Sequence, residues 1–211
     1  MKELLIIGAR GFGREVLALA KESEGFQDDF VVKGFLDDNA EVLDGYVDYP
    51  PIISSVEQYI PSANDVFICA LGDPHWQKHY AEIVLKKGGE FISLVHPTAV
   101  LGKNTKIGRG CIIHRDVFIS CDITFGNFVT CQPKAVVGHD VVVEDYCHLG
   151  TNTVMGGYSR VNSLTTLHPG AIILPHTKVG EDCVVGAGSV VIRKVKSGTT
   201  VYGNPARVLK F

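Results

Sequence analysis

Apolar residues recur at every sixth position through the second half of the chain. From Val95 to Val191, all seventeen positions at this spacing carry an apolar side chain. Four residues after each of the first sixteen comes a small or β-branched residue, and glycine directly follows the apolar position in eight repeats. A strict six-residue period does not form one stripe on an α-helix of 3.6 residues per turn. The pattern therefore predicts short strands separated by turns.

Each six-residue repeat fits one side of a triangular coil. The apolar residue points into a narrow prism, the second inward position must be small, and glycine adopts turn conformations that strain other residues. Three repeats close one coil, so the chain advances by roughly 4.8 Å for each coil. Residues 95–190 therefore predict an all-β parallel helix of about five coils.

The first ninety residues alternate between predicted strands and helices. We expect strands at 2–7, 30–36 and 65–71, and helices at 15–22, 55–60 and 75–87. Such alternation is typical of a small Rossmann-like α/β domain that binds ligand at the carboxyl ends of its parallel strands. We predict two domains, an α/β domain over residues 1–92 and a β-helix domain over residues 93–211.

Composition and charge argue against several classes of partner. Apolar residues make up 45% of the chain and charged residues 20%, as in globular proteins that bury a core. The net charge is −3, so we expect neither nucleic acid nor a membrane as partner. The apolar run at residues 4–7 is too short for a signal-peptide core. Six cysteines without a CxxC spacing indicate a reducing, cytoplasmic location.

Three motifs of the N-terminal half carry a family resemblance. They are Gly-Ala-x-Gly-x-Gly-Arg at residues 8–14, Phe-Leu-Asp-Asp at residues 35–38 and Gly-Asp at residues 72–73. With the repeats, they resemble the hexapeptide-repeat sugar O-/N-acyltransferases of the sialic acid O-acetyltransferase group, which includes UDP-4-amino-sugar N-acetyltransferases. The resemblance covers nearly the whole chain. It implies a left-handed β-helix, a homotrimer with active sites between neighbouring helices, and acetyl-CoA as co-substrate without a metal.

The resemblance also implies that the α/β domain binds the acceptor, a nucleotide sugar. A strand, a glycine-rich turn and a helix present backbone N–H groups to phosphate, although the GxxGxG spacing is not that of the NAD fingerprint. The family pattern brings the glycine turn to the diphosphate and the Asp-Asp pair to the base or sugar. The implied substrate-binding residues are Gly8, Gly11, Gly13, Arg14, Asp37, Asp38 and Gly72.

His139 is the candidate general base. Acetyl transfer from a thioester requires the acceptor to lose a proton as it attacks, and histidine titrates near neutrality. His139 follows the inward Val137 by two residues, so its side chain should point outward near a corner, where Asp140 can orient the ring. The family motif, a histidine followed by an acid, implies that both residues are catalytic. We expect direct transfer without an acyl-enzyme.

The expected acetyl-CoA contacts follow from stacking and from the resemblance. Gly157 lies one coil beyond His139, where a missing side chain leaves room for the thioester and an N–H for the oxyanion. The resemblance implies His148 near the acetyl group, and the later coils and C-terminal segment along the rest of CoA. The expected cofactor-binding residues are His148, Gly157, Leu167, Gly186, Ala187, Asn204, Pro205 and Arg207. The sequence at residues 167–169 departs from the family pattern and leaves the acyl chain length open.

Several functions remain open at this point. N-acetylation of a UDP-linked amino sugar is favoured because the Asp-Asp pair fits a nucleotide-linked acceptor; O-acetylation of a sugar or sialic acid is the main alternative. A metal enzyme like the γ-class carbonic anhydrases is disfavoured: His96 and His114 stack, but Gln132 follows in that column, and zinc needs three converging ligands. A non-catalytic nucleotide-sugar binding module is the last alternative.

Overall fold

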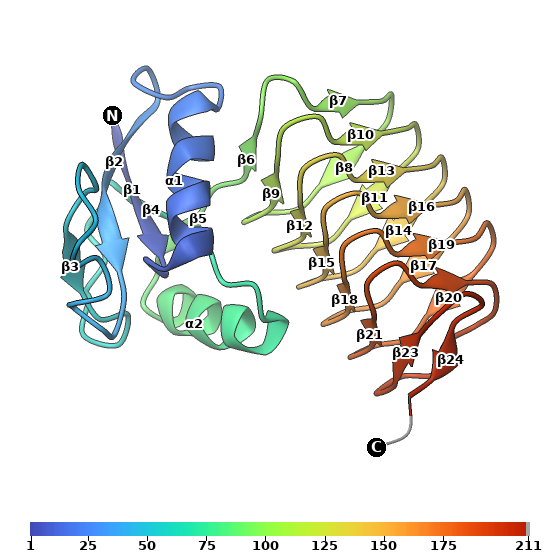
Figure 1. The fold of residues 1–211 in the computed structure, drawn as a ribbon. Coiled ribbons are helices and arrows are strands. Elements are labelled where there is room, and N and C mark those ends of the chain that lie inside the picture. The colour runs from blue at the N-terminus through green and yellow to red at the C-terminus, as the bar shows by residue number, and fades with distance from the viewer. Residues whose placement is uncertain (210–211) are drawn as a thin grey trace.

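The computed structural model describes residues 1–209 and shows an α/β unit followed by a parallel β-helix (Figure 1). The N-terminal sheet has five parallel strands in the order β3-β2-β1-β4-β5. These strands are β1 (Lys2–Ile7), β2 (Phe30–Leu36), β3 (Ile52–Ser54), β4 (Asp65–Cys69) and β5 (Glu90–Phe91). Its two helices are α1 (Gly11–Glu22) and α2 (Pro74–Lys86).

Three predicted elements of the α/β unit differ from the structure. Strand β4 ends at Cys69 rather than at Leu71. Helix α1 begins at Gly11 rather than Glu15, so part of the glycine-rich segment forms its first turn. Residues 55–60 form a turn rather than a helix, with the Tyr59 N–H donating to the Ser55 carbonyl at 3.1 Å. Pro61 follows directly, and a residue before proline is disfavoured in the helical region, so this turn cannot extend.

The β-helix has three faces built from strands of two or three residues. The docked face, which packs on the α/β unit, consists of β6 (Leu94–Val95), β9 (Ile112–Ile113), β12 (Thr130–Cys131), β15 (His148–Leu149), β18 (Thr166–Leu167), β21 (Val184–Val185), β23 (Thr200–Tyr202) and β24 (Arg207–Val208). The apolar face consists of β7 (Val100–Leu101), β10 (Phe118–Ile119), β13 (Val136–Val137), β16 (Val154–Met155), β19 (Ile172–Ile173) and β22 (Val190–Val191). The charged face consists of β8 (Lys106–Ile107), β11 (Thr124–Phe125), β14 (Val142–Val143), β17 (Arg160–Val161) and β20 (Lys178–Val179).

The register of these strands confirms the predicted coil. Phe118 pairs with Val136 and Val136 with Val154, so residues eighteen apart are neighbours on successive coils. The second residue of nearly every strand points inward and is buried in one continuous core, as the apolar period predicts. Because all three faces obey the same spacing, sequence separation fixes which side chains stack.

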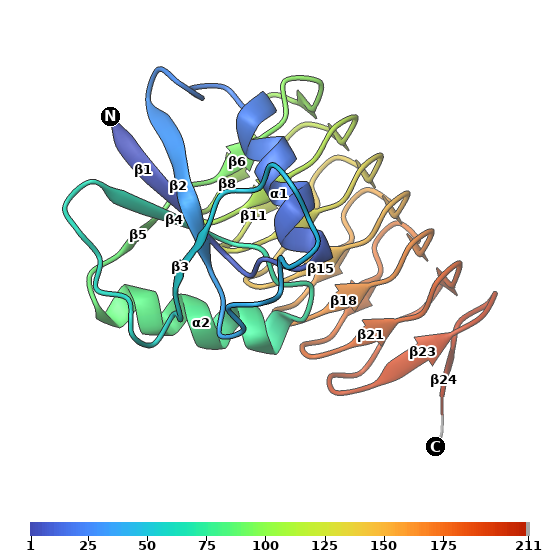
Figure 2. The ribbon, with the colours of Figure 1, turned by 60° about the vertical axis from the view of Figure 1, so that its left-hand side comes forward.

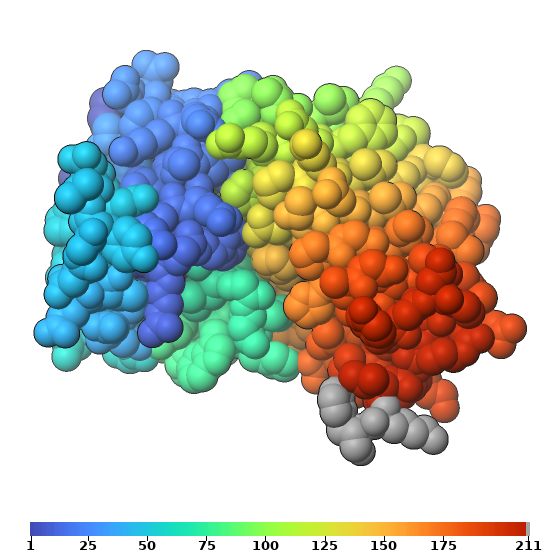
Figure 3. Space-filling model, viewed as in Figure 1, coloured from blue at the N-terminus to red at the C-terminus, as the bar shows by residue number. Residues whose placement is uncertain are grey.

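Helices α1 and α2 pack on opposite faces of the N-terminal sheet, because Leu4 and Ile6 share a buried cluster with α1 whereas Leu5 and Ile7 share one with α2. One side of this unit, which includes α1, lies along the docked face and forms a seam with it (Figures 1 and 2). The Phe12 ring of α1 contacts the rings of His114 and His148, with centroid distances of 6.2 and 6.0 Å. Farther along the seam, Phe91 packs edge-on against Phe128, with 4.9 Å between centroids. The space-filling view shows the two units in contact along this seam (Figure 3).

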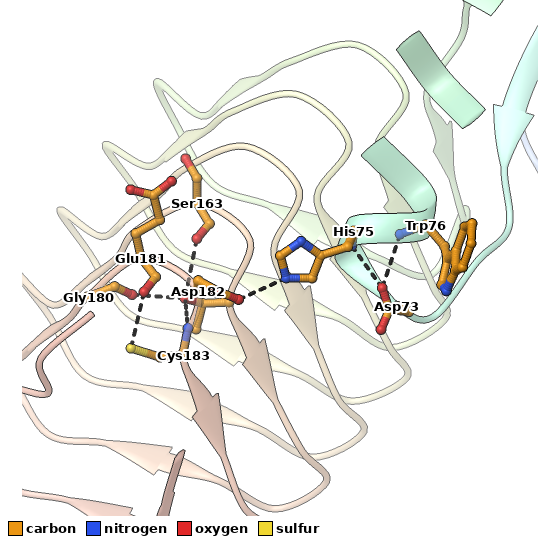
Figure 4. Close-up of polar contacts among 9 residues, drawn as sticks. Asp73, His75, Trp76, Ser163, Gly180, Glu181, Asp182 and Cys183 are labelled. Atoms are coloured by element: carbon orange, nitrogen blue, oxygen red, sulfur yellow. Dashed lines mark hydrogen bonds and ion pairs between the residues drawn. The ribbon is translucent and has the colours of Figure 1, made fainter. Parts of the chain in front are cut away.

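Polar contacts join the α/β unit to the β-helix at both edges of the seam. At one edge, Glu22 accepts hydrogen bonds from Arg115 at 2.8 Å and pairs with His96 at 3.0 Å. At the other edge, the ring of His75 reaches from the first turn of α2 to Asp182 on a coil, with 2.8 Å between Nε2 and Oδ1 (Figure 4). The α/β unit thus contacts the docked face and the two corners beside it.

Candidate functional site

A pocket of about 560 Å³ opens at the carboxyl ends of β1, β2 and β4. Strands β2 and β4 flank β1 on opposite sides, so the pocket lies at the topological switch point where open α/β sheets bind ligands. Four predicted substrate-binding residues line it: Gly8, Asp37, Asp38 and Gly72.

The glycine turn beside this pocket is closely packed. Gly8 has a left-handed φ of +91°, and a Cβ atom at Gly13 would come within 2.0 Å of the Gly8 carbonyl oxygen. The Ala9 N–H donates to Asp37 Oδ2 at 2.9 Å, so Asp37 holds the turn in place. No side chain caps the N-terminus of α1, which begins at Gly11. Its first N–H groups are therefore available to an anion.

Sequence reasoning missed several residues of this pocket, and Arg10, Trp76 and Tyr80 are those with the most distinctive side chains. Trp76 and Tyr80 are four residues apart on α2 and stack with 6.1 Å between ring centroids. The Tyr80 hydroxyl donates to Asp38, and this carboxylate raises the pKa of Tyr80. The sequence did contain a signal for Trp76 and Tyr80, because two aromatic residues four apart on a helix that follows a sheet strand lie on one face near the end of that strand.

Arg14 lies outside the residues that line the pocket. Its guanidinium stacks over the Tyr46 ring at 3.8 Å from the centroid and lies 5.9 Å from that of Tyr49. These tyrosines belong to the connection between β2 and β3, whose packing on α1 has no sequence signature. The predicted phosphate contact of Arg14 stays a prediction.

His139 and Gly157 adjoin at the corner between the apolar and charged faces. The His139 Nδ1 lies 2.9 Å from Asp140 Oδ2, and half of the His139 side chain is exposed. A Cβ atom at Gly157 would come within 2.6 Å of His139 Nε2, so only glycine leaves this side of the ring open. The Gly157 N–H donates no backbone hydrogen bond within residues 1–209. The predicted stacking of these two residues is present.

The corner of His139 is the one opposite the docked face. The Asp140 carboxylate can hold the Nδ1–H tautomer, which leaves Nε2 as the proton-accepting atom. Within residues 1–209, the polar and aromatic contacts between the α/β unit and the β-helix lie at the docked face and its two adjoining corners, and none of them reaches the corner of His139. One chain therefore does not bring His139 to the pocket of its own α/β unit.

His148 lies at a second cleft, of about 370 Å³, along the seam. This cleft is lined by Phe12 of α1 and by the docked-face segment that contains Leu167 and His168. Burial lowers the pKa of His148 to about 4, so its ring is neutral near pH 7. The Leu167 side chain is fully buried in the prism, so only its backbone can face a ligand there.

The remaining predicted CoA contacts lie toward the C-terminal end of the helix. A Cβ atom at Gly186 would come within 2.3 Å of the Tyr202 ring, and Ala187 beside it is exposed. Asn204, Pro205 and Arg207 are exposed around the turn into β24. The predicted site residues therefore form separate groups within one chain.

Two further features bear on function. Within residues 1–209, no cluster of three or more His, Cys, Asp or Glu side chains is arranged to hold a metal ion. None of the helices in this part of the chain combines the length and apolar character needed to cross a membrane.

Family models match both parts of the chain. Residues 3–84 match the PglD N-terminal domain, and residues 159–193 match the bacterial transferase hexapeptide family of six repeats. Among curated proteins, the chain is 29% identical over 215 residues to GDP-perosamine N-acetyltransferase of Escherichia coli O157:H7, covering 97% of this chain and 95% of that protein.

Solved structures match over nearly the full length. The acetyltransferase domain of PglB from Neisseria gonorrhoeae, also solved with acetyl coenzyme A, superposes with a TM-score of 0.90 at 25% identity, covering 99% of this chain and 100% of that one. PerB from Caulobacter crescentus, in complex with CoA and GDP-perosamine, gives 0.88 at 24% identity, covering 100% and 98%. The predicted fold class, an α/β domain followed by a left-handed β-helix, is confirmed. The chain thus joins a PglD N-terminal domain to the hexapeptide repeats of bacterial transferases, as the family resemblance predicted.

Proposed function

We propose that this protein transfers the acetyl group of acetyl-CoA to the amine of a nucleotide-linked amino sugar. The observation that carries the proposal is the His139–Asp140 pair beside the open backbone of Gly157. The second support is the pocket at the switch point of a separate acceptor domain, residues 1–92. The relative from Escherichia coli that matches over nearly its full length is named for its acceptor, GDP-perosamine. Since the family resemblance implies a UDP-linked sugar, guanosine and uridine sugars are both candidate acceptors.

The chemistry follows from the free Nε2 of His139. The neutral amine attacks the thioester carbonyl while its proton passes to Nε2, and Asp140 stabilises the resulting imidazolium from Nδ1. The Gly157 N–H is available to the developing oxyanion. The carbon–sulfur bond then breaks, and the CoA thiolate takes the proton back from the imidazolium. Trp76, Tyr80 and the free N–H groups of α1 are placed to hold the nucleotide.

The proposal includes a cyclic homotrimer. Four successive outward side chains of the apolar face are exposed by 37–52%: Val100, Phe118, Val136 and Val154. Such a continuous apolar stripe is typical of an interface. It borders the corner of His139, so a neighbouring chain seated there could present its acceptor pocket and docked-face cleft to His139. A head-to-tail contact forms a closed ring when the rotation between neighbours closes, and the ring proposed here has three chains.

Thiol release from acetyl-CoA tests the proposal. The assay should offer UDP-, GDP- and dTDP-linked amino sugars together with the matching hydroxyl sugars, and mass spectrometry should locate the acetyl group. We expect one CoA per acetylated amine and no CoA without acceptor. A burst of CoA in the absence of acceptor, or acetylation of a hydroxyl, would contradict the mechanism.

The free state of all six cysteines supports a cytoplasmic location.

A further inference from the structure

Tyr158 lies against the imidazole of His139 on the same corner. Their ring centroids are 5.1 Å apart and their planes meet at 88°, an edge-to-face arrangement. The Tyr158 N–H also donates to the His139 carbonyl at 3.0 Å, which fixes the two backbones relative to each other. His139 is therefore bounded by three groups: the Asp140 carboxylate, the backbone of Gly157 and the Tyr158 ring.

Tyr158 is itself held by the next coil. Its ring stacks on that of His176, with 5.0 Å between centroids and 6° between planes. Asp140, Tyr158 and His176 occupy the same left-handed turn position on successive coils, with φ of 56°, 58° and 58°. The His176 N–H donates to the Gly157 carbonyl at 3.0 Å, so the stacked pair is tied to the glycine that faces His139.

The Asp140 hydrogen bond alone is a weak restraint. Both side chains of the His139–Asp140 pair are substantially exposed, at 53% and 39%, and exposed ion pairs hold their geometry poorly. A base misplaced by about 1 Å loses much of its rate advantage. The Tyr158 ring, which is held on its other side by the His176 ring, limits the rotation of the His139 side chain that the hydrogen bond alone would allow.

We propose that Tyr158, backed by His176, is a positioning residue that holds the His139 imidazole in its reactive orientation. The inference rests on the proposed role of His139 as general base. Tyr158 acts through its ring, which contacts the rings of His139 and His176. We therefore expect catalysis to need the aromatic ring of Tyr158 but not its hydroxyl group.

Steady-state kinetics of Tyr158→Phe and Tyr158→Leu test the inference. Leu164 occupies the same kind of left-handed turn with φ of 60°, so leucine is compatible with the backbone there. We expect Tyr158→Leu to lower kcat roughly 10-fold with both KM values within about twofold, and Tyr158→Phe to keep at least half of the wild-type rate. Asn104→Leu, at the same corner three coils away from Tyr158, is the control and should keep full activity.

A double-mutant cycle with His139→Ala separates positioning from direct contact. If Tyr158 acts through His139, Tyr158→Leu costs nothing further in the His139→Ala background; an undiminished 10-fold loss there would overturn the inference. Full activity of His139→Ala would instead refute the proposed function. Carbon-13 relaxation of the His139 side chain in the free protein gives a readout that needs no activity. It should show greater mobility in Tyr158→Leu than in Tyr158→Phe, and equal mobility would overturn the inference.

Discussion

A side chain at Gly157 would fill the space beside the His139 imidazole. Gly157 does not have a left-handed φ, so Gly157→Ala introduces a contact of 2.6 Å with Nε2 but no backbone strain. We expect this substitution to lower kcat on the order of 100-fold through displacement of the base, while circular dichroism and the melting temperature stay close to wild type. A variant that folds and turns over at the normal rate would show that nothing reacts on this side of His139.

The contact between His139 and Gly157 could be predicted from the sequence because a parallel coil in constant register makes residues eighteen apart neighbours. Tyr158 was not predicted, since it reaches His139 diagonally across a corner and its direction depends on the left-handed turn. The placement of Arg14 on Tyr46 depends on an irregular loop, which carries no period. Regular spacing thus predicted the stacked part of the site, and irregular backbone determined the rest.

At the scale of elements, the seam between α1 and the docked face contains a buried histidine. His114 lies under Phe12, its Nε2 is buried without a hydrogen-bond partner, and burial lowers its pKa from 6.5 to about 4. The unfolded chain therefore binds more protons than the folded one between these values. Stability is fully present above pH 6.5 and falls as the pH is lowered toward 4.

We expect acidification from pH 7 to pH 5 to lower the free energy of unfolding by about 1 to 2 kcal/mol through His114. His114→Phe keeps a ring under Phe12 but cannot be protonated, so it should lose much of this dependence. His148, whose pKa burial also lowers to about 4, should supply what remains. Urea unfolding at pH 5, 6 and 7 measures the slope for both proteins. Equal slopes for wild type and His114→Phe would contradict the assignment.

The whole molecule exposes an apolar stripe that a single chain leaves uncovered. Phe118 and Val136 are adjacent on this face, exposed by 46% and 38%. We expect Phe118→Glu combined with Val136→Glu to prevent assembly, because two carboxylates would have to be buried without partners. Light scattering should change from three times the 22.9 kDa chain mass to the monomer. Lys106→Glu with Thr124→Glu, on the charged face, is the matched control and should leave the mass unchanged.

Separation of the site groups on one chain allows a test by complementation. Arg10→Glu places a negative charge in the pocket proposed for the nucleotide, and His139→Ala removes the proposed base from the opposite corner. Each variant alone should be nearly inactive. If each site joins the pocket of one chain to the His139 of its neighbour, every trimer that contains both variants has both intact groups at one of its three sites.

Co-expression of the two variants with different affinity tags and purification through both tags gives only mixed assemblies. Recovery of a substantial fraction of wild-type turnover in this material would show that neighbouring chains share each site, because no single chain in it carries both intact groups. Turnover that stays at the level of the single variants would place the whole site within one chain. It would also require the α/β unit to leave the docked face and cross to the His139 corner, which the Phe12, Glu22 and His75 contacts oppose.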